Sequence, residues 1–478
     1  MRTLLNNLRG GDWKTLLACF LYFDTGFTVW VMYGPLAHSI RGDLALTPSQ
    51  TAFMTAVPVL SAALLRVTFG NLYQSMDGRR LALLGIVLSS IPPTVLLLMP
   101  GLPSLNLLLM LGVLLGMGGA SFAVALPMAG SGYPPKVQGL VLGLAAAGNI
   151  GAVVDGFLFP TLAEHVGWQR AMAAALPLLA LAAASLLLWA KDRSVKSGSL
   201  PRAMASFAST IVFLALLVMV VNAGLPGLGG KTGMLLMPLI GALFVVAVLP
   251  ARYRAVFGER DTWSMMLIYA ITFGGFVGMS SYLSPLLIDM YGYSQVHAGL
   301  CMAGLAFTGA MLRPVGGWMA DRISGVRALL LLLAAIALCD FGFAIVQPGV
   351  VGGLVLLVIL YVAFGLGNGA CFQLVSQRWV GKAGLMSGVI GAAGGIGGFY
   401  LPMALGTSRE ILGNYWAGFA IFGGIACAAW LMLVALRSEW LQWALAEREH
   451  AAATSAVAAP PSTRDDARLP IDGSTKAA

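Results

Sequence analysis

The sequence predicts an all-α polytopic membrane protein of about 14 transmembrane helices, built as two parallel six-helix halves with an inserted two-helix hairpin. Three observations support this fold class. Of the 478 residues, 59% are hydrophobic and only 10% are charged, which is typical of a chain that lies mostly in lipid. The apolar residues form continuous runs of the roughly 20 residues that a membrane-spanning helix needs, without the alternation of a β-barrel. Two short patterns also recur at nearly the same spacing.

The apolar runs define the predicted helices in chain order. We expect membrane spans at about 14–38, 50–72, 80–99, 104–129, 138–162, 170–190, 206–224, 232–250, 263–288, 297–320, 327–347, 352–376, 384–406 and 415–437.

Charged residues in the loops predict how these helices are threaded. Lys and Arg are frequent in alternate loops, as at Arg79, Arg80 and Arg327. The loops between them carry few, mainly Arg41, Lys231 and Arg409. By the positive-inside rule both termini lie in the cytoplasm, as an even number of spans requires. The net charge of +9 therefore reflects topology, and we expect no nucleic-acid partner. We expect a multi-pass protein surrounded by the lipid of a bacterial-type inner (plasma) membrane, without a cleavable signal peptide.

An internal repeat divides the chain. RVTFG at 66–70 matches RPVGG at 313–317, and AAAGNIG at 145–151 matches GAAGGIG at 391–397, at offsets of 247 and 246 residues. Parallel repeats of six helices place a substrate site near the middle of the membrane, at the junction of the halves. The predicted segments are an N-terminal half at 1–190, a linker with two additional helices at 191–262, a C-terminal half at 263–437, and a disordered cytoplasmic tail at 438–478.

Arg66 and Arg313 are equivalent residues of this repeat, each on the second helix of its half. Arginine stays protonated, and a charge in mid-membrane normally faces a cavity or a partner. Each arginine could pair with a distant carboxylate, or the two together could hold an anion. The paired placement favours the anion, because a planar guanidinium donates two parallel hydrogen bonds to a planar oxyanion.

Glycine-rich stretches in the fifth and thirteenth spans predict closely packed helices and a narrow cavity for a small substrate. Asn149 lies within the first stretch, and its amide could donate either to an anion or to a neighbouring helix. The five Cys and four His do not cluster, so we expect no metal, no cofactor and no enzymatic activity.

Several motifs together resemble the nitrate/nitrite porter family of the major facilitator superfamily, over spans 1–6 and 9–14. GLAAAGNIGAVVDGF and GVIGAAGGIGGFYLP look like the paired nitrate signatures of that family, and ALLR and MLRP match its two substrate arginines. ADRISGVR resembles the loop common to the superfamily, and NLYQSMDGRR a degraded copy of it. FDTGFTVWVMYGPLA resembles the assimilatory, nitrate-importing branch. The resemblance implies the major facilitator fold and transport of nitrate, or nitrite, by alternating access.

The resemblance also implies roles for individual residues. Arg66 and Arg313 would bind the anion and Asn149 would lie beside it. Aromatic rings from the fourth and seventh core helices sandwich the anion in the family, and the matching residues here are Phe122, Tyr269 and Phe273. The remaining implied residues are the signature glycines Gly148, Gly151, Gly394 and Gly395, and the cytoplasmic gate-loop residues Asp77, Arg79, Arg80, Asp321 and Arg322. Two features depart from the family pattern, because Gly395 stands where Asn149 has its repeat mate and the hairpin is additional.

Two mechanisms could drive transport of the anion, namely proton coupling and exchange for nitrite. Inward movement of one negative charge costs roughly 2.3 kcal/mol per 100 mV, which co-transported protons or exchange for nitrite can offset. Asp24 is the best candidate for proton coupling, although a structural role as a counter-ion or helix–helix hydrogen bond is also open. We favour proton-coupled import by a monomer. The alternatives are a nitrate/nitrite antiporter or a carrier of small carboxylates such as formate or oxalate.

Overall fold

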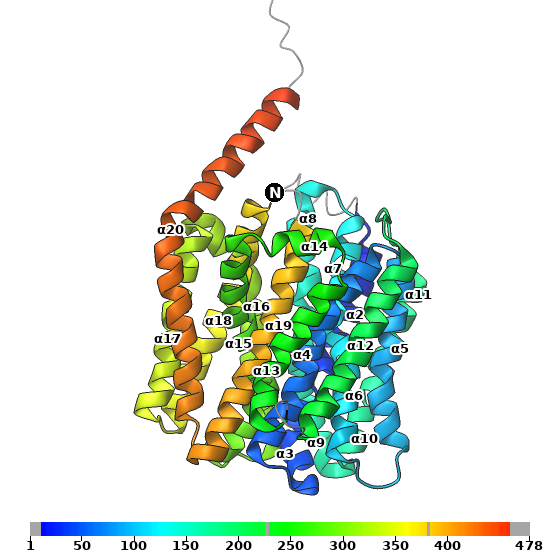
Figure 1. Ribbon diagram of the computed structural model, residues 1–478, viewed down its shortest axis with the longest axis vertical. Coiled ribbons are helices and arrows are strands. Elements are labelled where there is room, and N and C mark those ends of the chain that lie inside the picture. Colours follow the sequence, from blue (N-terminus) through cyan, green and yellow to red (C-terminus); the bar gives the residue numbers. More distant parts are fainter. Residues whose placement is uncertain (1–10, 225–228, 380–382, 459–478) are drawn as a thin grey trace, which may run out of the picture.

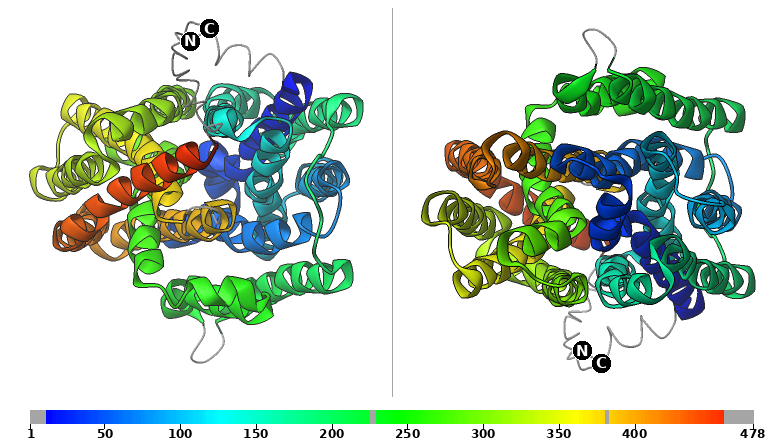
Figure 2. Two further views of the ribbon diagram at one scale, coloured as in Figure 1. Left: turned by 90° about the horizontal axis from the view of Figure 1, so that it is seen from above. Right: turned by 90° about the horizontal axis from the view of Figure 1, so that it is seen from below.

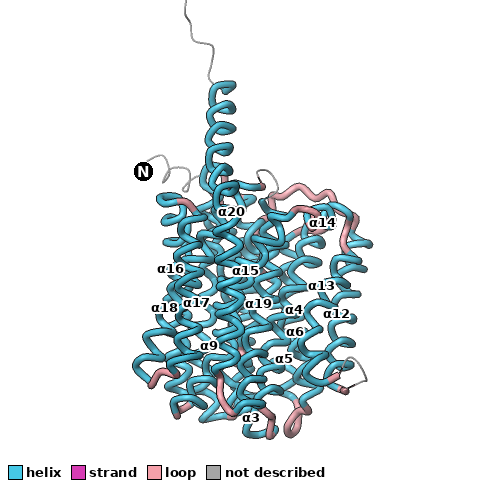
Figure 3. The backbone as a smooth tube through the Cα atoms, turned by 60° about the vertical axis from the view of Figure 1, so that its left-hand side comes forward, coloured by secondary structure: helices cyan, strands magenta, loops and turns pink. Residues whose placement is uncertain are grey.

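The computed structural model describes residues 11–224, 229–379 and 383–458, and all regular structure in these ranges is helical. Fourteen helices or helix pairs in this part are long and apolar enough to span a membrane, which confirms the predicted number. They stand side by side in one bundle, with the loops gathered at its two ends (Figure 1, Figure 3).

The first six spans form the N-terminal half. Their helices are α2 (Trp13–Val31), α3 (Tyr33–Leu44), α4 (Pro48–Tyr73), α5 (Gly78–Leu98), α6 (Leu105–Ala120), α7 (Phe122–Ser131), α8 (Pro135–Ala146), the 3₁₀ turn η1 (Ala147–Ile150), α9 (Gly151–Val166), α10 (Trp168–Ala173) and α11 (Ala175–Trp189).

The remaining helices form the inserted hairpin and the C-terminal half. The hairpin consists of α12 (Leu200–Asn222) and α13 (Gly230–Val248), and the short α14 (Ala251–Val256) follows it. The C-terminal half consists of α15 (Arg260–Tyr291), α16 (Gln295–Ile323), α17 (Gly325–Val346), α18 (Val350–Arg378), α19 (Ala383–Leu412) and α20 (Trp416–Ala458).

The last helix corrects the expectation of disorder from residue 438 onward. α20 continues to Ala458, and its final turns project beyond the bundle (Figure 1). Leu, Ala and Glu dominate the segment after Arg437, and these residues have the highest helix propensities, so the helix does not end where the membrane span ends. The rest of the predicted tail, 459–478, lies outside the described residues.

Local sequence signals explain where the core helices begin. Thr47 accepts a hydrogen bond from the backbone of Gln50, whose side chain bonds back to Thr47, so that α4 starts with a capping box and with Pro48 in its first turn. Ser294 caps α16 in a similar way through the backbone N–H of His297. These caps fix the ends of the two helices that carry the repeated arginines.

The two halves meet along helices that come from different parts of the chain. α4 packs along α19, α9 packs against α16, and α3 packs against α15. The hairpin lies along one side of the bundle (Figure 2), where α12 contacts α4 and α6 and α13 contacts α4 and α19. The hairpin therefore touches both halves.

Contacts between the halves are tight at the end of the bundle that carries α3, at the bottom of Figure 1. Ser39 donates to the side chain of Gln295 at 2.6 Å, and a carboxylate oxygen of Glu410 accepts from the backbone N–H of Ser49 at 3.0 Å. Gly156 and Gly299 face each other so closely that a methyl group on either would meet the backbone oxygen of the other. This end is closed by backbone-to-backbone packing that only glycine permits.

Candidate functional site

Arg66 lies between the two halves, with only 1% of its surface exposed. Its Nη2 donates to the carbonyl oxygen of Gly119 in the N-terminal half at 3.0 Å, and its Nη1 donates to that of Gly391 in the C-terminal half at 3.1 Å. Its Nε has no hydrogen-bond partner among the described residues. Arg66 thus bonds to the backbone of both halves, while its Nε–H stays uncommitted among the described residues.

Three aromatic rings surround the Arg66 guanidinium. Its Cζ lies 4.7 Å from the ring centre of Phe122, 5.6 Å from that of Phe273 and 5.7 Å from that of Trp30. The Trp30 indole is held in place because its Nε1 donates to the carbonyl of Pro58 at 2.9 Å. The negative faces of such rings attract a cation, which offsets part of the cost of burying it.

Arg313 is 7% exposed and is held differently. Its Nη2 donates to the hydroxyl of Tyr269 at 3.1 Å, and its Cζ lies 5.5 Å from the ring centre of Phe273 and 5.4 Å from that of Phe372. Its Nη1 has no hydrogen-bond partner among the described residues. All these partners belong to the C-terminal half.

Phe273 links the two cations. Its ring is the one that both guanidiniums contact, and the ring of Tyr269 stacks on it at 5.1 Å with an angle of 13°. The ion pairs in the described part of the chain lie elsewhere, and neither arginine has a carboxylate within 4.0 Å. The repeat therefore brings together two buried positive charges that have no counter-ion among the residues that the structure describes. Such an arrangement is suited to binding an anion.

The four signature glycines have different surroundings. A methyl group at Gly394 would lie 2.6 Å from Cδ1 of Phe273 and 2.9 Å from Cδ1 of Tyr269, so this glycine makes room for the stacked rings. The other three allow helices to approach: Gly395 faces Ala63 on α4, while Gly148 and Gly151 face α2. Among these four glycines, Gly394 is the one that contacts the stacked rings of Tyr269 and Phe273.

Asn149 lies in η1, between α2 and α16, and is 1% exposed. Its Oδ1 has no hydrogen-bond partner among the described residues. The 3₁₀ turn interrupts the fifth span at this position, which separates α8 from α9. The amide is therefore buried on an irregular turn beside the helix that carries Arg313.

Several residues of the site were not predicted from the sequence. In the sequence, Trp30 and Phe372 look like ordinary apolar residues of membrane helices. A backbone carbonyl such as that of Gly119 is present at every residue, so the sequence does not indicate its role. Asn368 could have been found, because it is a polar residue within an otherwise apolar helix. It is buried on α18, four residues before Phe372, and its Oδ1 also lacks a partner among the described residues.

The predicted gate-loop residues lie at the end of the bundle opposite α3. Asp77 caps α5 by accepting from the backbone N–H of Arg80 at 3.1 Å, whereas Arg79, Asp321 and Arg322 are exposed. The guanidinium of Arg322 lies over the ring of Trp318 at 5.1 Å.

A compact polar cluster lies beside them in the loop before α12. Asp192 accepts from the backbone N–H of Gly78 at 2.7 Å and from Tyr73 Oη at 3.0 Å, and forms an ion pair with Lys196 at 2.6 Å. Burial alone would raise the pKa of Asp192, but hydrogen bonds from Lys196, Ser194 and Gly78 outweigh it and hold this pKa below its usual value.

Asp24 is partly buried on α2, its backbone oxygen lies close to Gly151, and its Oδ1 lacks a partner among the described residues. No group of three His, Cys, Asp or Glu side chains that could hold a metal ion occurs in the part of the chain that the structure describes.

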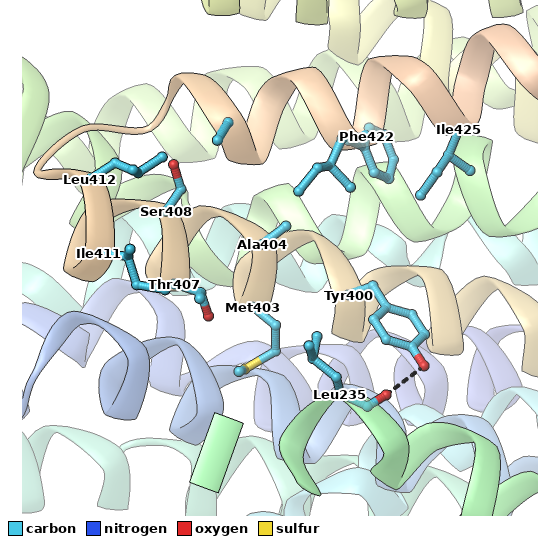
Figure 4. A pocket seen from close by; sticks show the side chains of 12 residues that line it. Leu235, Tyr400, Met403, Ala404, Thr407, Ser408, Ile411, Leu412, Phe422 and Ile425 are labelled. Atoms are coloured by element: carbon cyan, nitrogen blue, oxygen red, sulfur yellow. Dashed lines mark hydrogen bonds between the residues drawn. The ribbon is translucent and has the colours of Figure 1, made fainter. Parts of the chain in front are cut away.

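A separate groove opens between α13, α19 and α20 (Figure 4). It is lined by Leu235, Met403, Phe422, Ile425 and other mostly apolar residues, and Tyr400 Oη donates to the carbonyl of Leu235 at 2.8 Å on one side of it. An anion would find no cation there, so the arginine pair is the better candidate site.

Comparison with known proteins places the chain in a family. A model of the Major Facilitator Superfamily matches residues 16–402. The chain is 29% identical over 420 residues to the "Nitrite extrusion protein" of Bacillus subtilis (strain 168), covering 87% of this chain and 91% of that protein. It is 30% identical over 425 residues to the "Probable nitrate/nitrite transporter NarK2" of Mycobacterium tuberculosis (strain ATCC 25618 / H37Rv), covering 88% of this chain and 95% of that protein.

Among solved structures, the peptide transporter POT in complex with sulfate matches with a TM-score of 0.67 at 16% identity, over 90% of this chain and 95% of that one, which supports the fold alone. The membrane spans, the two halves and these relatives together lead to one conclusion: the chain is a membrane transporter that belongs to the nitrate/nitrite porter family of the major facilitator superfamily.

Proposed function

We propose that this protein is a secondary active transporter of nitrate, with nitrite as a possible second substrate, that works by alternating access in the inner membrane. One observation carries the proposal. The guanidiniums of Arg66 and Arg313 share the ring of Phe273, are almost fully buried, and have no carboxylate partner in the described part of the chain. An anion between them would supply the missing negative charge.

The surroundings favour a small planar anion. Arg66 and Arg313 each keep an N–H without a partner among the described residues, and flat rings flank both cations. A planar oxyanion accepts parallel hydrogen bonds from a guanidinium fork and fits beside flat rings. The names of the relatives from B. subtilis and M. tuberculosis support nitrate and nitrite over formate or oxalate, which share the planar shape.

Arg66 also suggests how binding is linked to movement. Because it donates to Gly119 in one half and Gly391 in the other, its hydrogen bonds must change when the halves rock against each other. An anion that takes over one of these donors would alter the balance between the two orientations. The gate-loop residues Asp77, Arg79, Arg80, Asp321 and Arg322 would then meet or separate at the cytoplasmic end, where both termini lie under this proposal.

The proposed direction is import coupled to protons. Nitrate entry against a negative interior costs about 2.3 kcal/mol per 100 mV, so one proton cancels that cost and a second lets the potential drive uptake. Asp24 is the proposed coupling residue. Exchange for nitrite is the alternative, and the name "Nitrite extrusion protein" of the B. subtilis relative is the observation that favours it.

Nitrate uptake into proteoliposomes tests both the proton coupling and the two-arginine anion site. Uptake should follow an imposed proton gradient without internal nitrite, whereas uptake that requires internal nitrite would establish exchange. Arg66→Lys and Arg313→Lys should each abolish uptake although the charge is kept, because Lys cannot form a two-pronged bond. Arg437→Lys, at an exposed position on α20, is the matched control. Normal uptake by both site variants would refute the two-arginine site, and stronger competition by formate or oxalate than by nitrite would change the substrate.

A further inference from the structure

We propose that Asp24 and Asp155 form one proton site between α2 and α9, and that a proton on this pair stabilises the closed α3 end of the bundle. This inference rests on the proposed proton coupling and extends it, because Asp155, and not Asp24 alone, becomes the residue that keeps the proton. Four features of the structure support it.

The first feature is the burial of Asp155. Its surface is 0% exposed, and neither of its carboxylate oxygens has a hydrogen-bond partner among the described residues. An ionised carboxylate in such surroundings would lose its hydration without any replacement, which is strongly unfavourable. A proton is the smallest ligand that removes this cost.

The second feature is the close approach of α9 to α2. A methyl group at Gly151 would lie 2.3 Å from the backbone oxygen of Asp24, and Thr28 Oγ1 lies 3.2 Å from the carbonyl oxygens of both Asp24 and Gly151. Asp155 is four residues after Gly151 and therefore lies on the same face of α9. The two acids thus share one helix interface.

The third feature is the lack of a counter-charge. Neither Asp24 nor Asp155 belongs to an ion pair in the described part of the chain. The helices packed against α9 carry these other titratable or charged side chains: Lys14, Cys19 and Tyr22 on α2; Tyr33, His38, Arg41 and Asp43 on α3; Arg170 on α10; and His297, Cys301, Arg313, Asp321 and Arg322 on α16.

Several of these groups are engaged elsewhere. Arg313 donates to Tyr269, His297 Nδ1 lies 2.8 Å from Ser294 Oγ, and Tyr33 Oη donates to the carbonyl of Leu108 at 2.9 Å. Two carboxylates at one buried helix interface without a paired cation cannot both ionise at low cost, so the pair retains a proton while the helices stay packed.

The fourth feature is the position of the pair between the anion site and the closed end. Phe23, next to Asp24, packs on the ring of Phe122 at 5.4 Å, and Phe122 lies against Arg66. On its other side α9 carries Gly156, which forms the close contact with Gly299 of the other half. After loss of the proton, the two carboxylates would repel each other and separate α9 from α2. This would displace Phe122 beside Arg66 and weaken the contact between Gly156 and Gly299 at the closed end.

Two transport modes separate this inference from the function on which it rests. In proteoliposomes, concentrative nitrate uptake driven by a proton gradient requires the coupling site, whereas exchange of labelled for unlabelled nitrate without a gradient requires only the anion site. Asp155→Asn and Asp24→Asn should each lose concentrative uptake and keep exchange. Asp155→Glu should restore concentrative uptake in part, because it returns a titratable group.

Asp340→Asn is the matched control. Asp340 is also buried with both oxygens lacking partners among the described residues, but it lies on α17 against Gly423 of α20, so this variant should keep proton-driven uptake. If the unchanged protein shows no proton-driven uptake, the proposed coupling itself fails. If it does and Asp155→Asn retains it, the paired site is refuted. If both pair variants lose exchange together with uptake, the pair is a structural contact and the inference is overturned.

Discussion

Arg66 and Arg313 occupy equivalent positions in the repeat, yet the structure holds them in different ways. Arg66 is fixed by two backbone carbonyls, one from each half, whereas Arg313 depends on the side-chain hydroxyl of Tyr269 within its own half. Backbone carbonyls cannot be removed by substitution and rotate little, while a tyrosine can move with its helix. We therefore expect the hydrogen bonds of Arg66 to depend on the relative position of the two halves. The side chain of Arg313 should be freer to move, because its partner moves with its own half.

The largest effect should come from the glycine beneath the shared rings. Gly394→Ala places a methyl group 2.6 Å from Cδ1 of Phe273, so the ring that both arginines contact must shift. Misplacing the binding groups by about 1 Å can reduce the rate about a hundredfold, and initial rates of nitrate uptake would measure this. Gly388→Ala on the same helix is the control, because its methyl group would meet nothing within 4 Å. Equal activity of the two variants would show that the rings are not held in place by Gly394.

A smaller effect should distinguish the two arginines. Tyr269→Phe removes the hydrogen bond to Arg313 and leaves both carbonyl bonds of Arg66 intact. The loss of one such bond is worth about 1–3 kcal/mol, so the KM for nitrate should rise at least about fivefold while the amount of folded protein stays the same. A KM that does not change would mean that Arg313 needs no positioning, and the two arginines would then be equivalent in function as well as in the repeat.

The smallest effect should come from a charge that is already paired. Asp192 is held by Lys196, Ser194 and Gly78, which lower its pKa, so its ionised form stabilises the fold. Because the folded pKa lies below the unfolded value of about 3.9, this contribution is complete above the unfolded pKa and is lost as the pH falls through the folded pKa. Asp192→Asn should lower the Tm of the purified protein at neutral pH and leave the KM for nitrate unchanged. A changed KM with an unchanged Tm would contradict this assignment.

Much of the fold could be predicted because its signals are local. The number of spans follows from apolar runs, and the relation between Arg66 and Arg313 follows from two patterns at one offset. The expected end of the last helix was wrong because hydropathy marks where lipid ends, whereas the helix propensity of the following residues carries α20 on to Ala458. The 3₁₀ turn η1 was not predicted either, because the apolar run of the fifth span continues through it without a change in hydropathy.

The contacts within the site could be predicted only in part. Phe122, Tyr269 and Phe273 were expected from the family resemblance, but Trp30 and Phe372 lie beside the arginines only because their helices cross there. The signature glycines were expected near the anion, and three of the four instead face neighbouring helices. A glycine motif in a sequence predicts a close approach, but it does not show whether a neighbouring helix, a ring or a ligand makes that approach.

Three properties follow from the order of the residues alone: 14 spans are expected, the halves are related, and each half carries one arginine in an apolar helix. These properties depend on each residue's own preference for lipid or water. Three other properties depend on the packing of the helices: both guanidiniums meet at Phe273, Arg66 bridges the halves, and Asp155 is fully buried on α9. These contacts join residues far apart in the chain, and they depend on how whole helices pack, which no short stretch of sequence specifies.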